Sequence, residues 1–231
     1  MKPRFPLSEE VLRHHVKQDV KQDLEEQQFE QRSAENSSSW GNLLSADSPL
    51  TEIFNSINIA ITHAMLKESK NEKWKCVEYI LYLVDPIMHR LLSLEKEMNG
   101  DTPESLLYSM CRLGICTFMG PIRRNCGKLG VSTKIYVKKM KDLLSDPRNA
   151  NVIRVPRSFI LWILFFGMLE AHGLQEEDWY LASLVKTAIG FRLTWESLLK
   201  RVSGFLWIEG VFEKELESAR TRYTAKLQAT H

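Results

Sequence analysis

Apolar residues are densest between Arg157 and Gly173, where the sequence reads RSFILWILFFGMLEAHG. Within this stretch no polar position recurs at the three- and four-residue spacing of a helix face. A helix that is apolar on every side belongs at the centre of a bundle. The uncharged run extends only from Ser158 to Leu169, well short of the roughly 20 residues that cross a membrane. We therefore predict a buried central helix over about 156–172 and not a membrane span.

Proline, glycine and capping hydroxyls divide the rest of the chain into helices. Ser48 and Thr102 can each cap a helix, and each is followed by a proline suited to the first helical turn. Apolar residues spaced three and four apart come next, as expected for one helix face. Gly120 and Pro121 are predicted to end the helix that follows Thr102, because proline cannot donate the hydrogen bond that continues a helix.

After the central helix the same spacing predicts three further helices. The first follows an acidic turn at 176–178, which complements the positive end of the helix dipole. Thr194 is a candidate cap for the second helix, and Gly210 separates the second from the third. No stretch alternates with a period of two over the length of a strand. The predicted fold class is therefore all-α, a single bundle of about seven to nine helices.

The N-terminal part of the chain has a different composition. It is dominated by Glu, Gln, Lys, Asp and His, followed by the Ser- and Asn-rich run RSAENSSSWGN. Val16, Val20 and Leu24 fall four apart, which indicates a polar helix with a narrow apolar stripe. We predict a polar, partly helical or disordered tail over 1–48 and a folded, all-helical domain over 49–225.

Composition restricts the class of protein. The chain has 231 residues, of which 44% are hydrophobic, and this is enough for one large domain with a core. The 31 basic residues outnumber the 29 acidic ones by so little that no overall field attracts nucleic acid. The first residues, MKPRFPLSEEVLRHH, lack the apolar segment of a signal peptide, so we expect an intracellular protein.

No motif in the sequence predicts metal binding or catalysis. The histidines form no H-E-x-x-H motif, the glycines form no phosphate-binding loop, and the aspartates are not clustered at a spacing that would hold magnesium. The cysteines contain no C-x-x-C pair and fit no zinc-ligand spacing, so we expect reduced, mostly buried thiols; they are Cys76, Cys111, Cys116 and Cys126. We therefore predict a non-catalytic protein with no cofactor and no metal site.

Positive charge is concentrated in one part of the chain. Arg123, Arg124 and Lys128 precede a predicted amphipathic helix with a lysine face. Such side chains can contact phosphates, and they supply the salt-sensitive part of nucleic-acid binding. Helical lysines are more often only the solvated face, which is our expectation here. The lysines are Lys134, Lys138, Lys139 and Lys141, and the apolar positions are Tyr136, Met140, Leu143 and Leu144.

The order of aromatic residues in the last helices resembles that of a known family. The segments concerned are Leu161-Trp162, Trp179-Tyr180, TWESL from Thr194 and FLWIE from Phe205. Their order resembles the C-terminal part of the fungal-specific transcription factor domain, the regulatory region that commonly follows a binuclear zinc-cluster DNA-binding motif. The segment ESLLYSMCRLG from Glu104 to Gly114 is similar to an earlier helix of that family. The resemblance spans about 50–223 and is strongest from Pro156 onward.

The chain departs from the family's full-length pattern because it has no zinc cluster. Two zinc ions that share six thiolates need six closely spaced cysteines, and this sequence has four dispersed ones. The resemblance therefore implies a nuclear, or otherwise cytoplasmic, regulatory domain that has no DNA-reading motif of its own. The partners implied are proteins, either a second copy in a homodimer or another transcription factor. We expect no membrane contact and no specific nucleic-acid binding by this chain alone.

Aromatic side chains are the candidate functional residues. They are predicted either to line a pocket for a small apolar effector or to pack the core; they are Trp162, Phe166, Trp179, Trp195 and Trp207. The main hypothesis is a non-catalytic transcription-regulator-like protein that acts through protein contacts, with a small-molecule effector as a further candidate ligand. The alternative is an all-α small-molecule-binding protein or enzyme unrelated to transcription, which a pocket with converging acids or histidines would favour.

Overall fold

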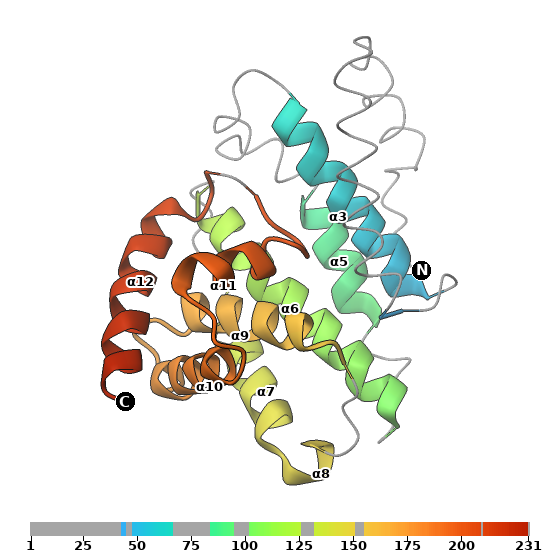
Figure 1. Cartoon of the computed structure of the whole chain (residues 1–231). Coiled ribbons are helices and arrows are strands. Elements are labelled where there is room, and N and C mark those ends of the chain that lie inside the picture. The colour runs from blue at the N-terminus through green and yellow to red at the C-terminus, as the bar shows by residue number, and fades with distance from the viewer. Residues whose placement is uncertain are drawn as a thin grey trace, which may run out of the picture.

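The computed structural model describes residues 43–44, 48–66, 84–94, 102–125, 132–150, 155–208 and 210–230. Over these ranges the chain forms nine helices and no strand, which confirms the predicted all-α class. Figure 1 shows their arrangement. The helices are α3 (Pro49–Leu66), α5 (Asp85–Ser93), α6 (Pro103–Asn125), α7 (Lys134–Ser145), α8 (Pro147–Ala150), α9 (Arg157–Glu170), α10 (Glu177–Gly190), α11 (Trp195–Val202) and α12 (Glu213–Gln228).

Helix α9 is the buried helix that the apolar pattern predicts. It contacts α6, α7, α10, α11 and α12, and it lies between them in Figure 1. Between Phe159 and Glu170 every residue except Ile160 is buried. The helix is slightly shorter than expected, because Pro156 precedes its first turn and the chain leaves it through a turn in which Gly173 has a φ of +77°. Within the described ranges, none of the helices combines the length and apolar character needed to span a bilayer.

The three predicted capping hydroxyls all accept a backbone hydrogen bond. Ser48 Oγ accepts from the amide of Leu50 at 3.3 Å at the start of α3. Thr102 Oγ1 accepts from an amide at the start of α6 at 3.2 Å, and Thr194 Oγ1 does the same at the start of α11 at 3.3 Å. Each bond satisfies one of the amides that have no partner inside the helix. These caps fix where three of the helices begin.

The predicted end of α6 at Gly120 and Pro121 is wrong. The helix continues through Pro121 to Asn125. Proline removes one hydrogen bond from a helix interior, and this cost is usually enough to end or kink it. Here Phe118 and Ile122, on either side of the proline, are fully buried, so leaving the helix would expose apolar surface. Ion pairs hold the last turn as well, and one of them is described below.

Two glycines let aromatic rings approach the helix backbones closely. A Cβ on Gly114 in α6 would lie 2.8 Å from the ring of Trp162. A Cβ on Gly167 in α9 would meet the ring of Tyr180 from α10 even more closely. Because real Cβ atoms essentially never come within 3.0 Å of another residue's atoms, both positions require glycine for this packing. The missing side chains are what brings α6 and α10 against α9.

Several sequence predictions concern residues outside the described ranges. The predicted tail over 1–48 is described only at 43–44 and 48. Cys76, Cys126 and Lys128 also lie outside the described residues. The other two cysteines, Cys111 and Cys116, lie on α6 as buried thiols, as expected, and burial raises the pKa of the Cys111 thiol.

Candidate functional site

Four of the five predicted aromatic residues gather around α9. Trp162 and Phe166 project from α9 itself, are fully buried, and have ring centroids 5.3 Å apart. Trp207 packs on Phe166 at 6.1 Å. Trp195, at the start of α11, packs on Phe165 at 6.0 Å. The ring centroids of these neighbours lie at the spacing of favourable aromatic pairs, so the four side chains pack together around α9, with Trp207 half-buried at the edge of the cluster.

Trp162 is held at a fixed position by polar and apolar contacts together. Its indole N–H donates to the backbone carbonyl of Leu206 at 3.1 Å, which satisfies the one polar atom of a buried side chain. Its ring lies against Gly114 of α6 on one side and packs with Phe159 and Phe205 at 6.2 and 6.4 Å. The side chain therefore joins α6, α9 and the segment after α11.

Trp179 lies apart from this cluster. It is half-buried on α10, and its ring meets that of Tyr180 edge-on at 4.9 Å. Tyr180 is fully buried, and its hydroxyl donates to the carbonyl of Val137 in α7 at 2.8 Å. Burial, with Glu176 and Asp142 nearby, raises the pKa of the Tyr180 hydroxyl, so it keeps the proton that it donates. This hydrogen bond fixes α10 against α7.

A buried carboxylate joins α6 to α9. The side chain of Glu170 is fully buried and accepts two hydrogen bonds from Arg124, one of them from Nη1 to Oε2 at 2.7 Å. The hydrogen bond with Glu170 raises the pKa of the Arg124 guanidinium. Gly120 leaves room for the pair, because a Cβ there would lie 2.5 Å from Glu170 Oε2. A buried carboxylate that is paired with an arginine through two hydrogen bonds joins the two helices, so we assign Glu170 a structural role.

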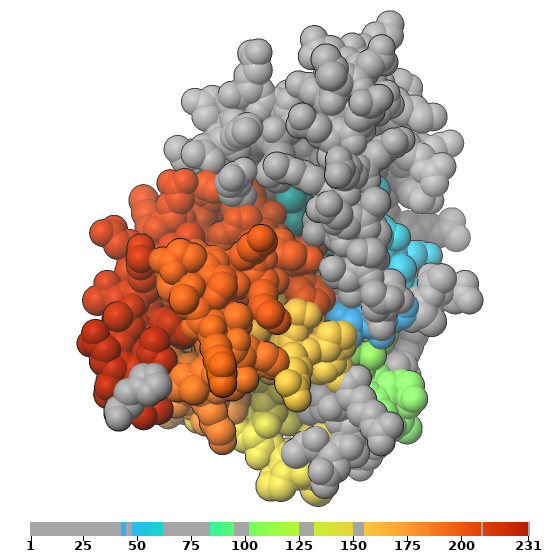
Figure 2. Space-filling model, in the orientation of Figure 1, coloured from blue at the N-terminus to red at the C-terminus, as the bar shows by residue number. Residues whose placement is uncertain are grey.

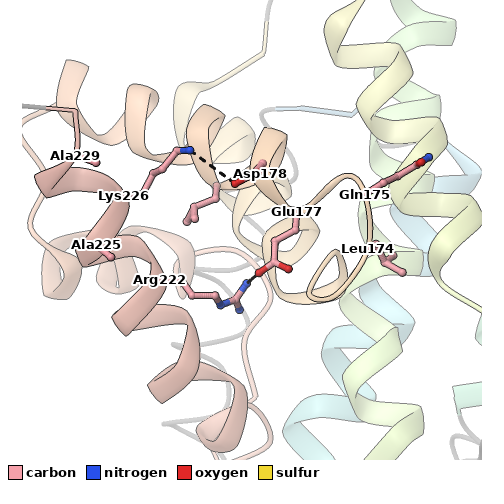
Figure 3. A pocket seen from close by; sticks show the side chains of 9 residues that line it. Leu174, Gln175, Glu177, Asp178, Arg222, Ala225, Lys226 and Ala229 are labelled. Carbon is pink, nitrogen blue, oxygen red and sulfur yellow. Dashed lines mark hydrogen bonds and ion pairs between the residues drawn. The ribbon is translucent and has the colours of Figure 1, made fainter.

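A second acidic residue, Glu177, connects the start of α10 to α12. It accepts hydrogen bonds from the amide of Gly173 at 2.7 Å, from His172 Nδ1 at 3.0 Å and from Arg222. Partial burial acts to raise the pKa of Glu177, and these three hydrogen bonds together outweigh it, so the pKa lies below its ordinary value. Figure 3 shows Arg222 reaching from α12 toward this carboxylate.

Beside Glu177 the surface is hollowed between α10 and α12. The groove has a volume of about 560 Å³ and is wide open to solvent. Its charged residues face one another: Arg222 pairs with Glu177, and Nζ of Lys226 lies 3.7 Å from Oδ1 of Asp178. Figure 3 shows both pairs. The acids in the groove are thus engaged with cations from α12. Its lining residues are Leu174, Gln175, Glu177, Asp178, Leu181, Arg222, Ala225, Lys226 and Ala229.

The lysine-bearing helix α7 has one firmly buried face and one exposed face. Val137 and Met140 are buried against the rest of the domain. On the opposite face Lys134 and Lys138 are exposed, and between them Ile135 is 58% exposed. Ile135 is not among the predicted apolar positions of this helix, and its spacing from Lys138 places it on the lysine face. We refer to these three exposed residues as the α7 face.

Comparisons with protein-family models, with curated proteins and with solved structures return no match to this chain.

Proposed function

We propose that this chain is a non-catalytic regulatory domain, of the kind found in fungal transcription factors, that acts through contacts with other proteins. The α7 face is the observation that carries the proposal. Ile135 exposes 58% of its surface, the most among the large hydrophobic residues that the structure describes. A partner that covers an exposed aliphatic side chain removes apolar area from water, which favours association. Lys134 and Lys138 then form the charged rim around it.

The way in which α7 is anchored supports this role. Val137 and Met140 pack into the core, and the Tyr180 hydroxyl is bonded to the backbone of α7. Side chains presented on a rigid helix lose less freedom on binding than side chains on a loop, so less of the contact energy is cancelled. The lysines also guide a partner of opposite charge toward the face.

The aromatic cluster supports a scaffold role for the interior. Trp162 and Phe166 are fully buried against each other and against Phe212 and Phe118. The resemblance in aromatic order to the fungal regulatory domain supports action in transcription and in the nucleus. In this proposal the partner is a protein, either a second copy of the chain or another transcription factor, and DNA is reached only through it.

A tethering experiment tests the proposal. The full chain is fused to an unrelated DNA-binding domain, and transcription of a reporter is measured in fungal cells. We expect the fusion to change reporter output several-fold relative to the DNA-binding domain alone. Replacing Ile135→Ser should return the output to that baseline, because the apolar centre of the contact is removed.

The matched control is Ile59→Ser, which makes the same replacement at a 41% exposed position on α3. This variant should regulate like the unaltered chain. Fusion protein levels and nuclear location are measured for all three proteins. A folded, nuclear fusion that leaves the reporter unchanged would refute regulation, and equal losses in the two variants would refute the α7 face as the contact.

A further inference from the structure

Two arginines share one aromatic ring on the surface of the domain. Phe191 lies in the turn between α10 and α11 and is half-buried. The Cζ atoms of Arg157 and Arg201 lie 5.1 and 5.7 Å from the centre of its ring. Both distances are within the range of cation–π attraction. Arg157 opens α9 and Arg201 is near the end of α11, so three separate parts of the chain meet at this ring.

The two guanidinium groups can be no further apart than the sum of these two distances. Like charges held this close repel each other, and the ring offsets only part of that repulsion. Elsewhere in the described residues arginines hold glutamates: Arg124 pairs with Glu170, and Arg222 with Glu177. Among those same residues no carboxylate pairs with Arg157 or Arg201, and both side chains are exposed. The site is therefore positively charged and open to an anion.

A third arginine stands next to the ring in an unusual backbone conformation. Arg192 has a φ of +53°, and its amide donates to the carbonyl of Ile189 at 2.9 Å as α10 ends. Glycine is the usual residue where a helix ends in this left-handed conformation, because a side chain there is strained. An arginine that occupies such a position places one more exposed cation beside Phe191. Backbone strain of this kind occurs most often at functional sites.

We propose that Arg157, Phe191, Arg192 and Arg201 form a docking site for an acidic segment of a protein partner. The planar guanidinium fork matches a carboxylate and can donate two parallel hydrogen bonds to it. Because the ring already holds two of the guanidiniums in place, less side-chain freedom is lost when the carboxylates bind. The half-buried ring of Phe191 gives the aliphatic part of a glutamate a surface to pack on. Figure 2 shows α10 and α11, in orange, at the surface beside the golden start of α9.

The geometry favours an acidic peptide over a nucleic acid. Binding to nucleic acid depends on a row of phosphate contacts along a strand, whereas the guanidiniums of Arg157 and Arg201 converge on a single ring. Single-stranded nucleic acid also needs aromatic faces on which bases stack, and guanidiniums already cover the Phe191 ring. The net charge of +2 adds no wider positive field. This inference rests on the proposed function, because it names the chemistry of a partner for the same regulatory domain.

Fluorescence anisotropy of a labelled hexaglutamate peptide, titrated with the full chain, tests the site. We expect saturable binding that weakens about ten-fold or more in the double variant Arg157→Gln, Arg201→Gln, which loses two bidentate donors. The matched control is Lys186→Gln, Lys214→Gln, which removes the same charge from exposed positions on α10 and α12 and should leave the affinity within about two-fold. Phe191→Leu keeps an apolar side chain but removes the ring, and we expect a loss of about two- to five-fold.

Three results would overturn the inference. The first is an absence of saturable hexaglutamate binding. The second is an equal loss in the arginine and lysine double variants, which would show that only net charge matters. The third is a decathymidine oligonucleotide or inorganic phosphate that displaces the labelled peptide more effectively than unlabelled hexaglutamate does. All substituted positions except Phe191 are exposed, and circular dichroism checks that each variant keeps its helices.

The reporter assay separates this inference from the proposed function. If the wild-type chain fails to bind hexaglutamate while the fusion still regulates through Ile135, the docking site is refuted and the proposed function stands. If the chain binds the peptide through its arginines while the fusion leaves the reporter unchanged, the docking site stands and the proposed function is refuted.

Discussion

Replacing Gly167 with alanine tests how closely α10 packs on the central helix. A Cβ at this position would lie 2.8 Å from Cζ of Tyr180 and closer still to the neighbouring ring carbon. Tyr180 is fully buried, and its hydroxyl is bonded to Val137 of α7. The ring therefore cannot move away from a new methyl group without breaking that hydrogen bond or separating the helices. One added methyl group on α9 would therefore disturb the contacts that α9 and α7 make with α10.

The size of the effect follows from three contributions. Forcing an extra methyl group into a filled core costs about 1–3 kcal/mol. Loss of the Tyr180–Val137 hydrogen bond costs about 1 kcal/mol more. Alanine is the better helix former, and in a helix interior this returns about 1 kcal/mol. We therefore expect Gly167→Ala to lower the free energy of unfolding by about 1–3 kcal/mol.

Urea unfolding followed by helical circular dichroism measures this difference. The control is Gly190→Ala at the end of α10, where an added Cβ would meet no atom within 4 Å. It should be neutral or stabilise the protein by up to about 1 kcal/mol. If Gly167→Ala is as stable as Gly190→Ala, the described packing of Tyr180 on α9 is wrong. If the clash is the cause, adding Tyr180→Leu to Gly167→Ala should cost less than the sum of the single effects.

Three further changes have expected outcomes. Trp162→Ala should lower the free energy of unfolding by about 3–5 kcal/mol and bring the protein near unfolding, whereas Trp179→Ala, half-buried, should cost clearly less in the same thermal denaturation assay. Arg124→Ala leaves the buried Glu170 carboxylate without its cation and should lower the free energy of unfolding by about 3 kcal/mol, a loss limited by the half-exposed position of the arginine. Adding Glu170→Gln removes the unpaired charge and should restore part of the stability measured by urea unfolding. The pKa of Glu177 in the folded protein lies below its ordinary value of 4.5. Its ionised carboxylate therefore stabilises the fold above pH 4.5, and this stabilisation is lost as the pH falls through the lower folded pKa. The difference in Tm between wild type and Glu177→Gln should shrink below pH 4.5, and a constant difference would contradict the pKa shift.

Features that depend on neighbouring residues could be predicted from the sequence. The capping roles of Ser48, Thr102 and Thr194 each involve an amide two or three residues away, so local order is enough to reveal them. The buried central helix could be predicted because α9 is apolar on every side, which leaves it only one place in a bundle. The all-α fold class could be predicted because apolar residues recur at three- and four-residue spacing.

Features that depend on tertiary contacts could not be predicted. Pro121 reads as a helix end, yet burial of its neighbours and the Arg124–Glu170 pair keep α6 continuous through it. The grouping of Arg157 with Phe191 and Arg201 joins the start of α9 to residues 34 and 44 positions further along the chain, so no local spacing signals it. For the candidate aromatics, the sequence could not show that Trp179 lies apart while the other four pack around α9. Those outcomes depend on how helices approach one another.

The crowding of rings around Trp162 also provides an optical readout. Four aromatic neighbours, with ring centroids 5.3 to 6.4 Å from that of Trp162, give the immobile indole an asymmetric electronic environment. Side chains fixed in this way give circular dichroism in the near ultraviolet, which disappears when packing becomes fluid even if the helices persist. The near-ultraviolet band should therefore vanish before the far-ultraviolet helical signal whenever the centre loosens first. Near- and far-ultraviolet spectra recorded together would then distinguish a molten interior from an unfolded chain.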